Sequence, residues 1–436
     1  MPNSDQSEFY WLEFDKGGRL VEPESFDRLK AGLIAKGATD LVVMSHGWKN
    51  DRAAALRIYK PLWENTRAAL SKLDPARIVV AGILWPSVPY RTNFDEAALL
   101  QAANQGALSA DADGGVEDIT DDQLDLAIRD YLGEDSDPPF RDLALKASED
   151  LSSDEAAALV RTAILRLRTH DVDPELAADF EPLVDRAEND PNDVLLSLAA
   201  RPVLSPDSSV GGALGIGDDL QKFFAGSKAA VARLLGQLSF YDMKERAGLI
   251  GAALGDLIAT NGVGDRRLHL VGHSFGARLV TSAASTLAGK GKTIDSLALL
   301  QGAFSHNALS PDFDGKPGAF AAAASGAVGL VAITHTHNDR ACTLAYAAAS
   351  RISRDVASSV GDASDKFGAM GANGAQNIPV VRHTGLPGAA GTKPVRGTVN
   401  NYLADAYIRG TPPGTDAHGD VFNPQIGKLL ASVLEA

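Results

Sequence analysis

Cysteine is almost absent from the chain, with one residue, Cys342, among 436. A lone cysteine excludes an internal disulfide framework and is typical of a reducing compartment. The N-terminal segment has neither a basic region nor an apolar run, so we predict no secretory signal peptide. Long apolar runs are also lacking: residues 319–333 come nearest to a membrane span, but they are short and interrupted by glycines. Together these absences predict a cytoplasmic protein.

Basic residues are scarce in one part of the chain, and that part carries all of the excess negative charge. The net charge of the whole chain is −15. The segment from Asp95 to Arg233 holds 30 acidic and 11 basic residues, a net charge of −19, whereas the remainder has a net charge of +4. Such a segment would repel a polyanion, which excludes nucleic acid and anionic membranes as its partners. A solvated helical surface is the simplest interpretation, and a surface for a basic protein partner is the alternative.

Strand-like and helix-like patterns alternate in residues 1–90 and again in residues 239–436. Buried-strand runs are expected at 9–14, 40–44, 77–84, 268–271, 296–300, 329–334 and 399–408, helices at 24–36, 51–73, 241–259, 341–351 and 429–434, and a glycine-rich loop region at 361–391. This alternation predicts an α/β fold with a mostly parallel sheet covered by helices on both faces. Residues 91–238 are helical and acidic in pattern without such alternation, which predicts a helical cap inserted into that core.

The most informative stretch is LHLVGHSFGARLV, residues 268–280. Strand-favouring residues lead into the pentad GHSFG, and a helical Ala/Leu/Val pattern follows at once. A serine between strand and helix in this pattern occupies a tight, strained turn with its hydroxyl above the sheet edge. Gly272 and Gly276 have no Cβ, so the strand and the helix can approach each other closely. We therefore predict Ser274 as a nucleophile, with His273 shaping the site beside it.

A serine nucleophile needs a base to accept its proton and an acid to fix the tautomer of that base. With a strand-turn-helix serine, the partners follow along the chain in the order Asp, then His. Asp339 comes just after the predicted strand 329–334, and His418 lies in a loop before the final helix. We predict Asp339 as the acid and His418 as the base. The alternatives are a helix N-cap for Asp339 and a solvated loop position for His418.

Four other residues compete for these two roles. Asp295 precedes a predicted strand and so belongs to the wrong edge of the sheet. His335 and His337 share a strand end with Asp339, which makes a direct triad geometry awkward. His383 lies in the glycine-rich region and is the next choice for the base.

The oxyanion formed on attack needs two N–H donors that are already in place. One is predicted to be the backbone N–H of Phe275, the residue after the nucleophile. The other is expected from the loop after an earlier strand, where Trp48 follows the strand 40–44. In the same loop, His46 and Gly47 are expected to shape the backbone and not to transfer protons.

These motifs make the chain resemble the α/β-hydrolase superfamily. The matching parts are VVMSHGW, GHSFG, HND and AHGD, within a framework of residues 9–87 and 241–436. The resemblance implies a triad of Ser274, Asp339 and His418 on a mostly parallel sheet that needs no cofactor.

The insertion departs from the pattern of this family. Family caps commonly enter after the sixth strand, which here is the short interval between residues 300 and 329. The predicted cap instead enters after the strand that ends at Trp85. Known lid geometries therefore cannot be carried over to this chain.

The predicted activity is hydrolysis of a small-molecule carboxylic ester through an acyl-enzyme. An amidase or serine peptidase is the nearest alternative, because the same triad serves both kinds of leaving group. A hypothesis of another class is a catalytically silent hydrolase scaffold whose acidic insertion binds a protein partner.

Other motifs predict no cofactor and no metal. GKGKT at residues 289–293 is similar to the end of a phosphate-binding loop, but Thr286 stands where the first glycine is needed and a strand follows. Residues 211–217 form a glycine-rich turn with no strand before it. No set of cysteine and histidine residues has metal-ligand spacing.

Overall fold

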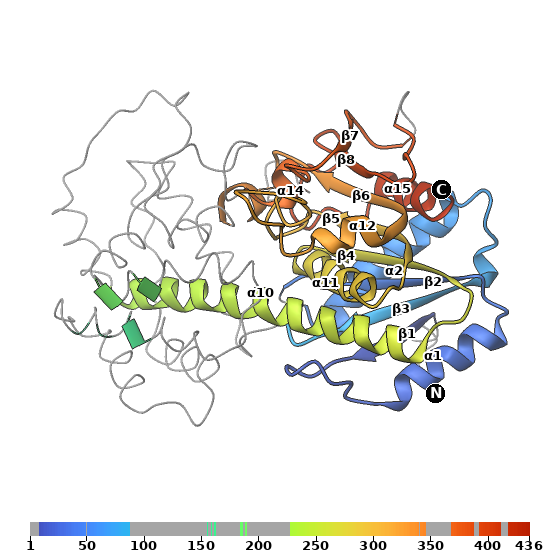
Figure 1. The fold of residues 1–436 in the computed structure, drawn as a ribbon, viewed down its shortest axis with the longest axis horizontal. Coiled ribbons are helices and arrows are strands. Elements are labelled where there is room, and N and C mark those ends of the chain that lie inside the picture. The colour runs from blue at the N-terminus through green and yellow to red at the C-terminus, as the bar shows by residue number, and fades with distance from the viewer. Residues whose placement is uncertain are drawn as a thin grey trace. The chain divides into compact units, whose positions relative to one another are not determined.

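The computed structural model describes residues 8–48, 50–87, 227–339, 341–345, 368–387, 392–410 and 417–436, together with isolated positions between 155 and 189. The chain divides into two compact units, and the larger consists of Met1–Val88, Lys244–Tyr346 and Gly361–Ala436. The fold below is that of the larger unit (Figure 1). The predicted cap, residues 91–238, lies outside the described residues except for the isolated positions and the first part of one long helix.

Eight strands within the described residues form a single sheet. They are β1 (Phe9–Glu13), β2 (Asp40–Ser45), β3 (Ile78–Leu84), β4 (Arg267–His273), β5 (Ile294–Leu300), β6 (Ala327–His335), β7 (Val380–His383) and β8 (Val399–Leu403). Their order is β1-β3-β2-β4-β5-β6-β8-β7, and every neighbouring pair is parallel. The fold is therefore α/β, with a sheet that is wholly parallel where the sequence predicts a mostly parallel one. In β2 and β3 every residue is buried, as expected for strands covered on both faces.

Helices cover both faces of the sheet. They are α1 (Glu24–Ala35), α2 (Arg52–Ala69), α10 (Ser227–Asn261), α11 (Phe275–Gly289), α12 (Ala321–Gly326), α14 (Met370–Asn373) and α15 (Pro424–Leu434). Helices α1 and α2 lie on opposite faces of the sheet. Successive side chains of β1 point to opposite faces, and Tyr10 packs against Gly32 of α1 while Phe9 packs against Tyr59 of α2. On the α1 face, α10 and α11 run side by side (Figure 1), and a Cβ on Gly251 of α10 would lie 2.1 Å from the Leu279 carbonyl oxygen of α11.

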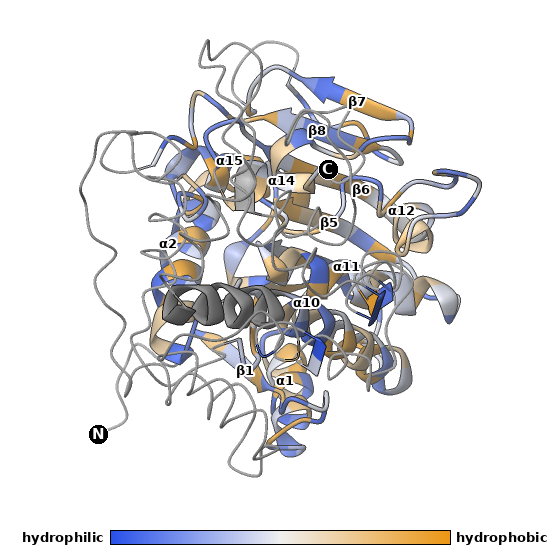
Figure 2. Cartoon of the chain, turned by 90° about the vertical axis from the view of Figure 1, so that its left-hand side faces the viewer, coloured by the Kyte–Doolittle hydropathy of each residue, from blue (hydrophilic) through white to orange (hydrophobic). Residues whose placement is uncertain are grey.

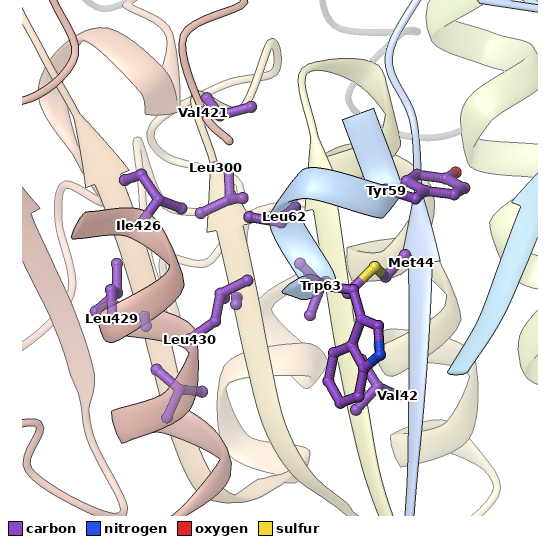
Figure 3. Close-up of a cluster of buried hydrophobic side chains, with 14 of the residues drawn as sticks. Val42, Met44, Tyr59, Leu62, Trp63, Leu300, Val421, Ile426, Leu429 and Leu430 are labelled. Carbon is purple, nitrogen blue, oxygen red and sulfur yellow. The ribbon is translucent and has the colours of Figure 1, made fainter. Parts of the chain in front are cut away.

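Helices α2 and α15 build the hydrophobic core of the other face. Helix α2 begins where the Asp51 side chain accepts the Ala54 N–H at 2.7 Å, and its buried residues recur at helical spacing. Figure 2 shows the resulting alternation of hydrophobic and hydrophilic patches along α2. The two helices and the strands beneath them bring together the residues labelled in Figure 3, among them Val42, Tyr59, Leu300 and Leu430. Each large apolar side chain buried here contributes about 1.5–3 kcal/mol, so this layer holds β2, β4 and β5 in register.

Three expectations for the C-terminal half are corrected by the structure, and a fourth is tested only in its first residues. The region 361–391 is not only loop, because it contains α14 and the edge strand β7. The strand expected at 399–408 ends at Leu403. The helix expected at 341–351 begins with a π-helical turn, Ala341–Ala345, and residues 346–367 lie outside the described residues. The helix expected at 241–259 begins earlier, at Ser227, so α10 runs through the predicted boundary at residue 238. Among the described residues, no helix is both long and apolar enough to cross a bilayer.

Candidate active site

Ser274 occupies the turn between β4 and α11. Its backbone has φ 58° and ψ −125°, a left-handed conformation that a residue with a Cβ rarely adopts. The Ser274 N–H donates to the Leu300 carbonyl at the end of β5, at 3.1 Å. Strained backbone of this kind persists only where the surrounding structure holds it, and it is concentrated at functional sites.

Two glycines of the pentad are required by close backbone approach. A Cβ on Gly272 would lie 2.3 Å from the Gly276 carbonyl oxygen, and a Cβ on Gly276 would lie 2.4 Å from the carbonyl oxygens of Ser45 and His46. Both clashes are with backbone, which cannot move aside as a flexible side chain can. The pattern Gly-x-Ser-x-Gly is therefore a steric requirement for placing α11 against β2 and β4.

The turn lies where the strand order reverses. From β2 the chain moves outward to β3 and then returns to β4 on the other side of β2. In open parallel sheets, ligands bind outside the carboxyl ends of the strands at such a switch point. The loop after β2 lies directly against Ser274, because a Cβ on Gly47 would be 2.6 Å from Ser274 Cβ and 3.1 Å from Ser274 Oγ.

The three predicted triad residues lie in one hydrogen-bonded row. The distance from His418 Nε2 to Ser274 Oγ is 2.8 Å, and that from His418 Nδ1 to Asp339 Oδ2 is also 2.8 Å. An ionised carboxylate only accepts hydrogen bonds, so Nδ1 carries the proton donated to Asp339. Nε2 is then the unprotonated nitrogen and accepts the Ser274 hydroxyl. This is the tautomer that a general base needs.

Asp339 is buried, and its hydrogen bonds suit both of the roles that the sequence left open. Its Oδ1 accepts the Cys342 N–H at 2.9 Å, which caps the π-helical turn, while Oδ2 accepts from His418. Burial favours the neutral acid and acts to raise the pKa of this carboxyl. The attraction to His418 and the hydrogen bonds donated by His418, Cys342 and Gln301 outweigh burial, so the pKa of Asp339 lies below its ordinary value. The carboxylate is therefore ionised at neutral pH.

The competing residues have other environments. Asp295 lies near the amino end of β5 and accepts the Leu268 N–H at 2.8 Å, away from the carboxyl edge of the sheet. His337 is exposed and pairs with Asp405 at 2.9 Å. His383 lies in β7 and stacks on Tyr402 with ring centroids 4.3 Å apart. Burial lowers the pKa of His335 to about 4.

His273 and His46 are buried beside the triad, where both stay neutral. His273 Nε2 donates to the His418 carbonyl at 2.8 Å, so it holds the backbone of the base. Burial lowers the pKa of His273 to about 3 and that of His46 to about 4. His46 Nδ1 donates to the Gly47 carbonyl at 2.8 Å, and its ring stacks on Trp85 at 5.6 Å. Both contacts fit the loop-shaping role expected of His46.

Phe275 and Trp48 border the nucleophile. Phe275 is the first residue of α11, where backbone N–H groups point out of the helix end. Trp48 follows Gly47, and its ring lies 5.9 Å from that of Phe275. The oxyanion-donor roles of their N–H groups stay predictions.

Sequence reasoning missed two residues beside the triad. Gln301, directly after β5, donates from Nε2 to Asp339 Oδ2 at 2.9 Å. The Cys342 sulfur lies 3.8 Å from His418 Nδ1. Asp339, Cys342 and His418 thus place three possible metal-ligand atoms within 4.8 Å of one another, a grouping that sequence spacing did not reveal. The signal for Gln301 was its position at a strand end next to the switch point; for Cys342 it was its place three residues after Asp339.

A second Ser-His-Asp set lies at the opposite end of the strands. His269 Nδ1 is 2.7 Å from Ser296 Oγ, and His269 Nε2 is 3.0 Å from Asp40 Oδ1. Asp40 also pairs with Arg267 at 2.7 Å. Ser296, His269 and Asp40 are each 1% exposed, so no substrate can reach this serine. The set ties β2, β4 and β5 together and offers a matched control for the first set, in which Ser274 is 5% exposed and the His418 side chain 18%.

No protein-family model matches the chain, and neither a curated protein nor a solved structure matches it. The function is therefore inferred from the geometry of the site.

Proposed function

We propose that the chain is a serine hydrolase of the α/β-hydrolase superfamily that cleaves carboxylic esters through an acyl-enzyme. The observation that carries the proposal is the row of two 2.8 Å hydrogen bonds from Ser274 through His418 to Asp339. Its support is the strained turn that presents Ser274 at the switch point of a parallel sheet.

Each of the three residues has one chemical role. His418 Nε2 takes the proton of Ser274 as Oγ attacks the carbonyl carbon of the ester, and Asp339 stabilises the resulting imidazolium. Collapse of the tetrahedral intermediate breaks the bond to the alcohol oxygen, which leaves with the proton held by His418. Water then attacks the acyl carbon and gives a proton to His418. The bond between the acyl carbon and Ser274 Oγ breaks, His418 returns the proton to Oγ, and the carboxylic acid leaves.

The oxyanion of both tetrahedral intermediates is proposed to accept from the N–H groups of Phe275 and Trp48. The position of Phe275 at the start of α11 supports the first donor, because the helix end favours negative charge. The contact of the preceding Gly47 with Ser274 supports the second. Removal of one such donor typically slows a reaction about 10²- to 10³-fold.

Covalent labelling tests whether Ser274 is a nucleophile. The wild-type protein is expected to react with a fluorophosphonate probe, and Ser274→Ala is not. Ser296→Ala is the matched control, because it removes a serine that also hydrogen-bonds a histidine, at 2.7 Å, but lies within β5 near the opposite end of the strands. We expect Ser296→Ala to be labelled like the wild type. If wild type and Ser274→Ala are labelled equally, or if neither is labelled, the hydrolase proposal fails and the silent-scaffold hypothesis is favoured.

Substrate class is tested separately with a series of nitrophenyl esters of increasing acyl length and with peptide amides. Turnover of short acyl esters supports the ester proposal. Cleavage of peptide amides with no turnover of any ester would favour the amidase or peptidase alternative, which uses the same triad.

A further inference from the structure

Gln301 enters the site from the strand that separates the nucleophile from the acid. In the sheet, β5 lies between β4, which ends before Ser274, and β6, which ends before Asp339. Gln301 is the first residue after β5, and it is completely buried. Its φ of 47° is in the left-handed region that favours glycine. A long amide side chain is thus held in a disfavoured backbone conformation at the centre of the site.

Hydrogen bonds on all sides determine which way the Gln301 amide points. The Gln301 N–H donates to Thr334 Oγ1 at 3.2 Å, and the Thr334 hydroxyl in turn donates to Gln301 Oε1 at 3.0 Å. This closed pair of bonds identifies the amide oxygen, so the NH₂ group must face the other way. There, Nε2 donates to Asp339 Oδ2 at 2.9 Å and to the Gly371 carbonyl at 3.0 Å. Both N–H hydrogens are used, and only one orientation satisfies every partner.

The contact with Asp339 is made to the oxygen that the base uses. Oδ2 accepts from both Gln301 and His418, while Oδ1 accepts the Cys342 N–H. Without the amide, the carboxyl group could rotate about its broad χ2 minimum or take up a proton in its buried position. Either change would remove the acceptor that keeps the proton on His418 Nδ1.

We propose that Gln301 is a positioning residue that holds Asp339 Oδ2 ionised and in line with His418 Nδ1. The inference rests on the proposed hydrolase function, and Gln301 acts through Asp339 without touching the substrate. The strained φ of Gln301 is the conformation that brings its amide between Thr334 and Asp339.

Two substitutions with different pH behaviour test the proposal by the rate of fluorophosphonate labelling. Gln301→Met keeps the length of the side chain but removes both N–H donors. Labelling should slow by about 10- to 100-fold at every pH, the rate equivalent of one hydrogen bond to a charged group. Gln301→Glu places a second carboxyl against Oδ2. At low pH that carboxyl carries a proton and can donate it in a hydrogen bond to Asp339, whereas at higher pH the two carboxylates repel each other. Its deficit relative to wild type should therefore grow as pH rises.

Asn401→Leu is the control for loss of a buried amide. Asn401 exchanges hydrogen bonds with the backbone N–H and carbonyl of Ala375, both at 3.0 Å, and it is 1% exposed. We expect a lower melting temperature for this variant with an unchanged pH profile of labelling. Labelling of both Gln301 variants at the wild-type rate, with only their melting temperatures reduced, would overturn the positioning role and leave the hydrolase proposal intact.

An NMR signal separates failure of the inference from failure of the proposed function. The proton on His418 Nδ1 is predicted to shift or disappear in Gln301→Met but not in Asn401→Leu. If the wild type is not labelled and this shift still occurs, the hydrolase proposal fails and the positioning role stands. If the wild type is not labelled and the proton is unchanged in Gln301→Met, both fail.

Discussion

Replacement of Gly47 by alanine is expected to disable Ser274 while the protein stays folded. Gly47 belongs to the loop after β2, and a Cβ added to it would lie 2.6 Å from Ser274 Cβ and 3.1 Å from Ser274 Oγ. The next atom in its path is the His273 carbonyl oxygen at 3.3 Å. Gly47 does not have a positive φ in the structure, so alanine can adopt its backbone conformation. The substitution therefore changes the space beside Ser274 and not the backbone conformation of residue 47.

The size of the effect follows from these distances. Ordinary van der Waals contact to a Cβ begins at 3.4 Å, so Gly47 and Ser274 must separate by close to 1 Å. Ser274 is held by its strained turn and by its N–H bond to Leu300 at 3.1 Å, and the displacement has to be shared between the turn and the loop. A misplacement of about 1 Å typically costs about 10²-fold in rate, and overpacking costs about 1–3 kcal/mol in stability.

Fluorophosphonate labelling and thermal unfolding measure the two effects on the same samples. Gly47→Ala should be labelled about 10²-fold more slowly than wild type. Gly289→Ala is the control, since no atom lies within 4 Å of the added Cβ at the end of α11, and its labelling and stability should match or slightly exceed those of wild type. Labelling of Gly47→Ala at the wild-type rate would refute the contact between this loop and the nucleophile.

Three further predictions concern the acid, a buried histidine and a helix cap. Asp339→Asn should slow labelling about 10⁴-fold and lower the melting temperature, because the amide oxygen can still accept the Cys342 N–H but the amide NH₂ group then faces the Gln301 Nε2 donor; a rate within tenfold of wild type would contradict the role of Asp339. Burial lowers the pKa of His273 from 6.5 to about 3, so the unfolded chain binds the extra proton first and stability falls as pH decreases below 6.5. This histidine should account for a loss of about 2 kcal/mol between pH 7 and pH 5. His273→Gln, which retains a donor for the His418 carbonyl, should remove that much of the pH dependence of urea unfolding; equal pH dependence in both proteins would exclude it. Asn423 accepts the Ile426 N–H at 3.1 Å at the start of α15, so Asn423→Ala should lower the free energy of unfolding by about 1 kcal/mol without changing the labelling rate, and an unaltered urea midpoint would argue against the cap.

Local sequence patterns were sufficient to predict most strands of the sheet. Continuous apolar runs such as those of β2 and β3 are buried on both faces, so composition alone marks them as strands. The edge strand β7 was missed because it has four residues, three of them not buried, within a glycine-rich region. The length of α10 was also missed, since the change in composition near residue 238 does not coincide with a helix end. Edge strands and long helices are defined by neighbours more than by their own residues.

The sequence by itself determined the strained turn at Ser274, which depends on adjacent residues. A glycine on either side and a change from strand to helix are local requirements, and the structure realises them as a positive φ at Ser274 and backbone contacts at Gly272 and Gly276. The order Ser274, Asp339 and His418 along the chain, for three residues that hydrogen-bond in one row, could also be predicted. The sequence did not show that Asp339 serves as a cap and as the partner of His418 at once.

Only the tertiary structure decided which residues meet. His418 lies 144 positions from Ser274, yet strand order and register bring Nε2 to within 2.8 Å of Oγ. The same packing forms a second Ser-His-Asp row around His269 that is buried and closed to substrate. It also brings Gln301 to the acid. Residue type alone does not distinguish the two rows. The pentad marks Ser274 in the sequence, but the end of the strands at which each row lies is a property of the assembled sheet.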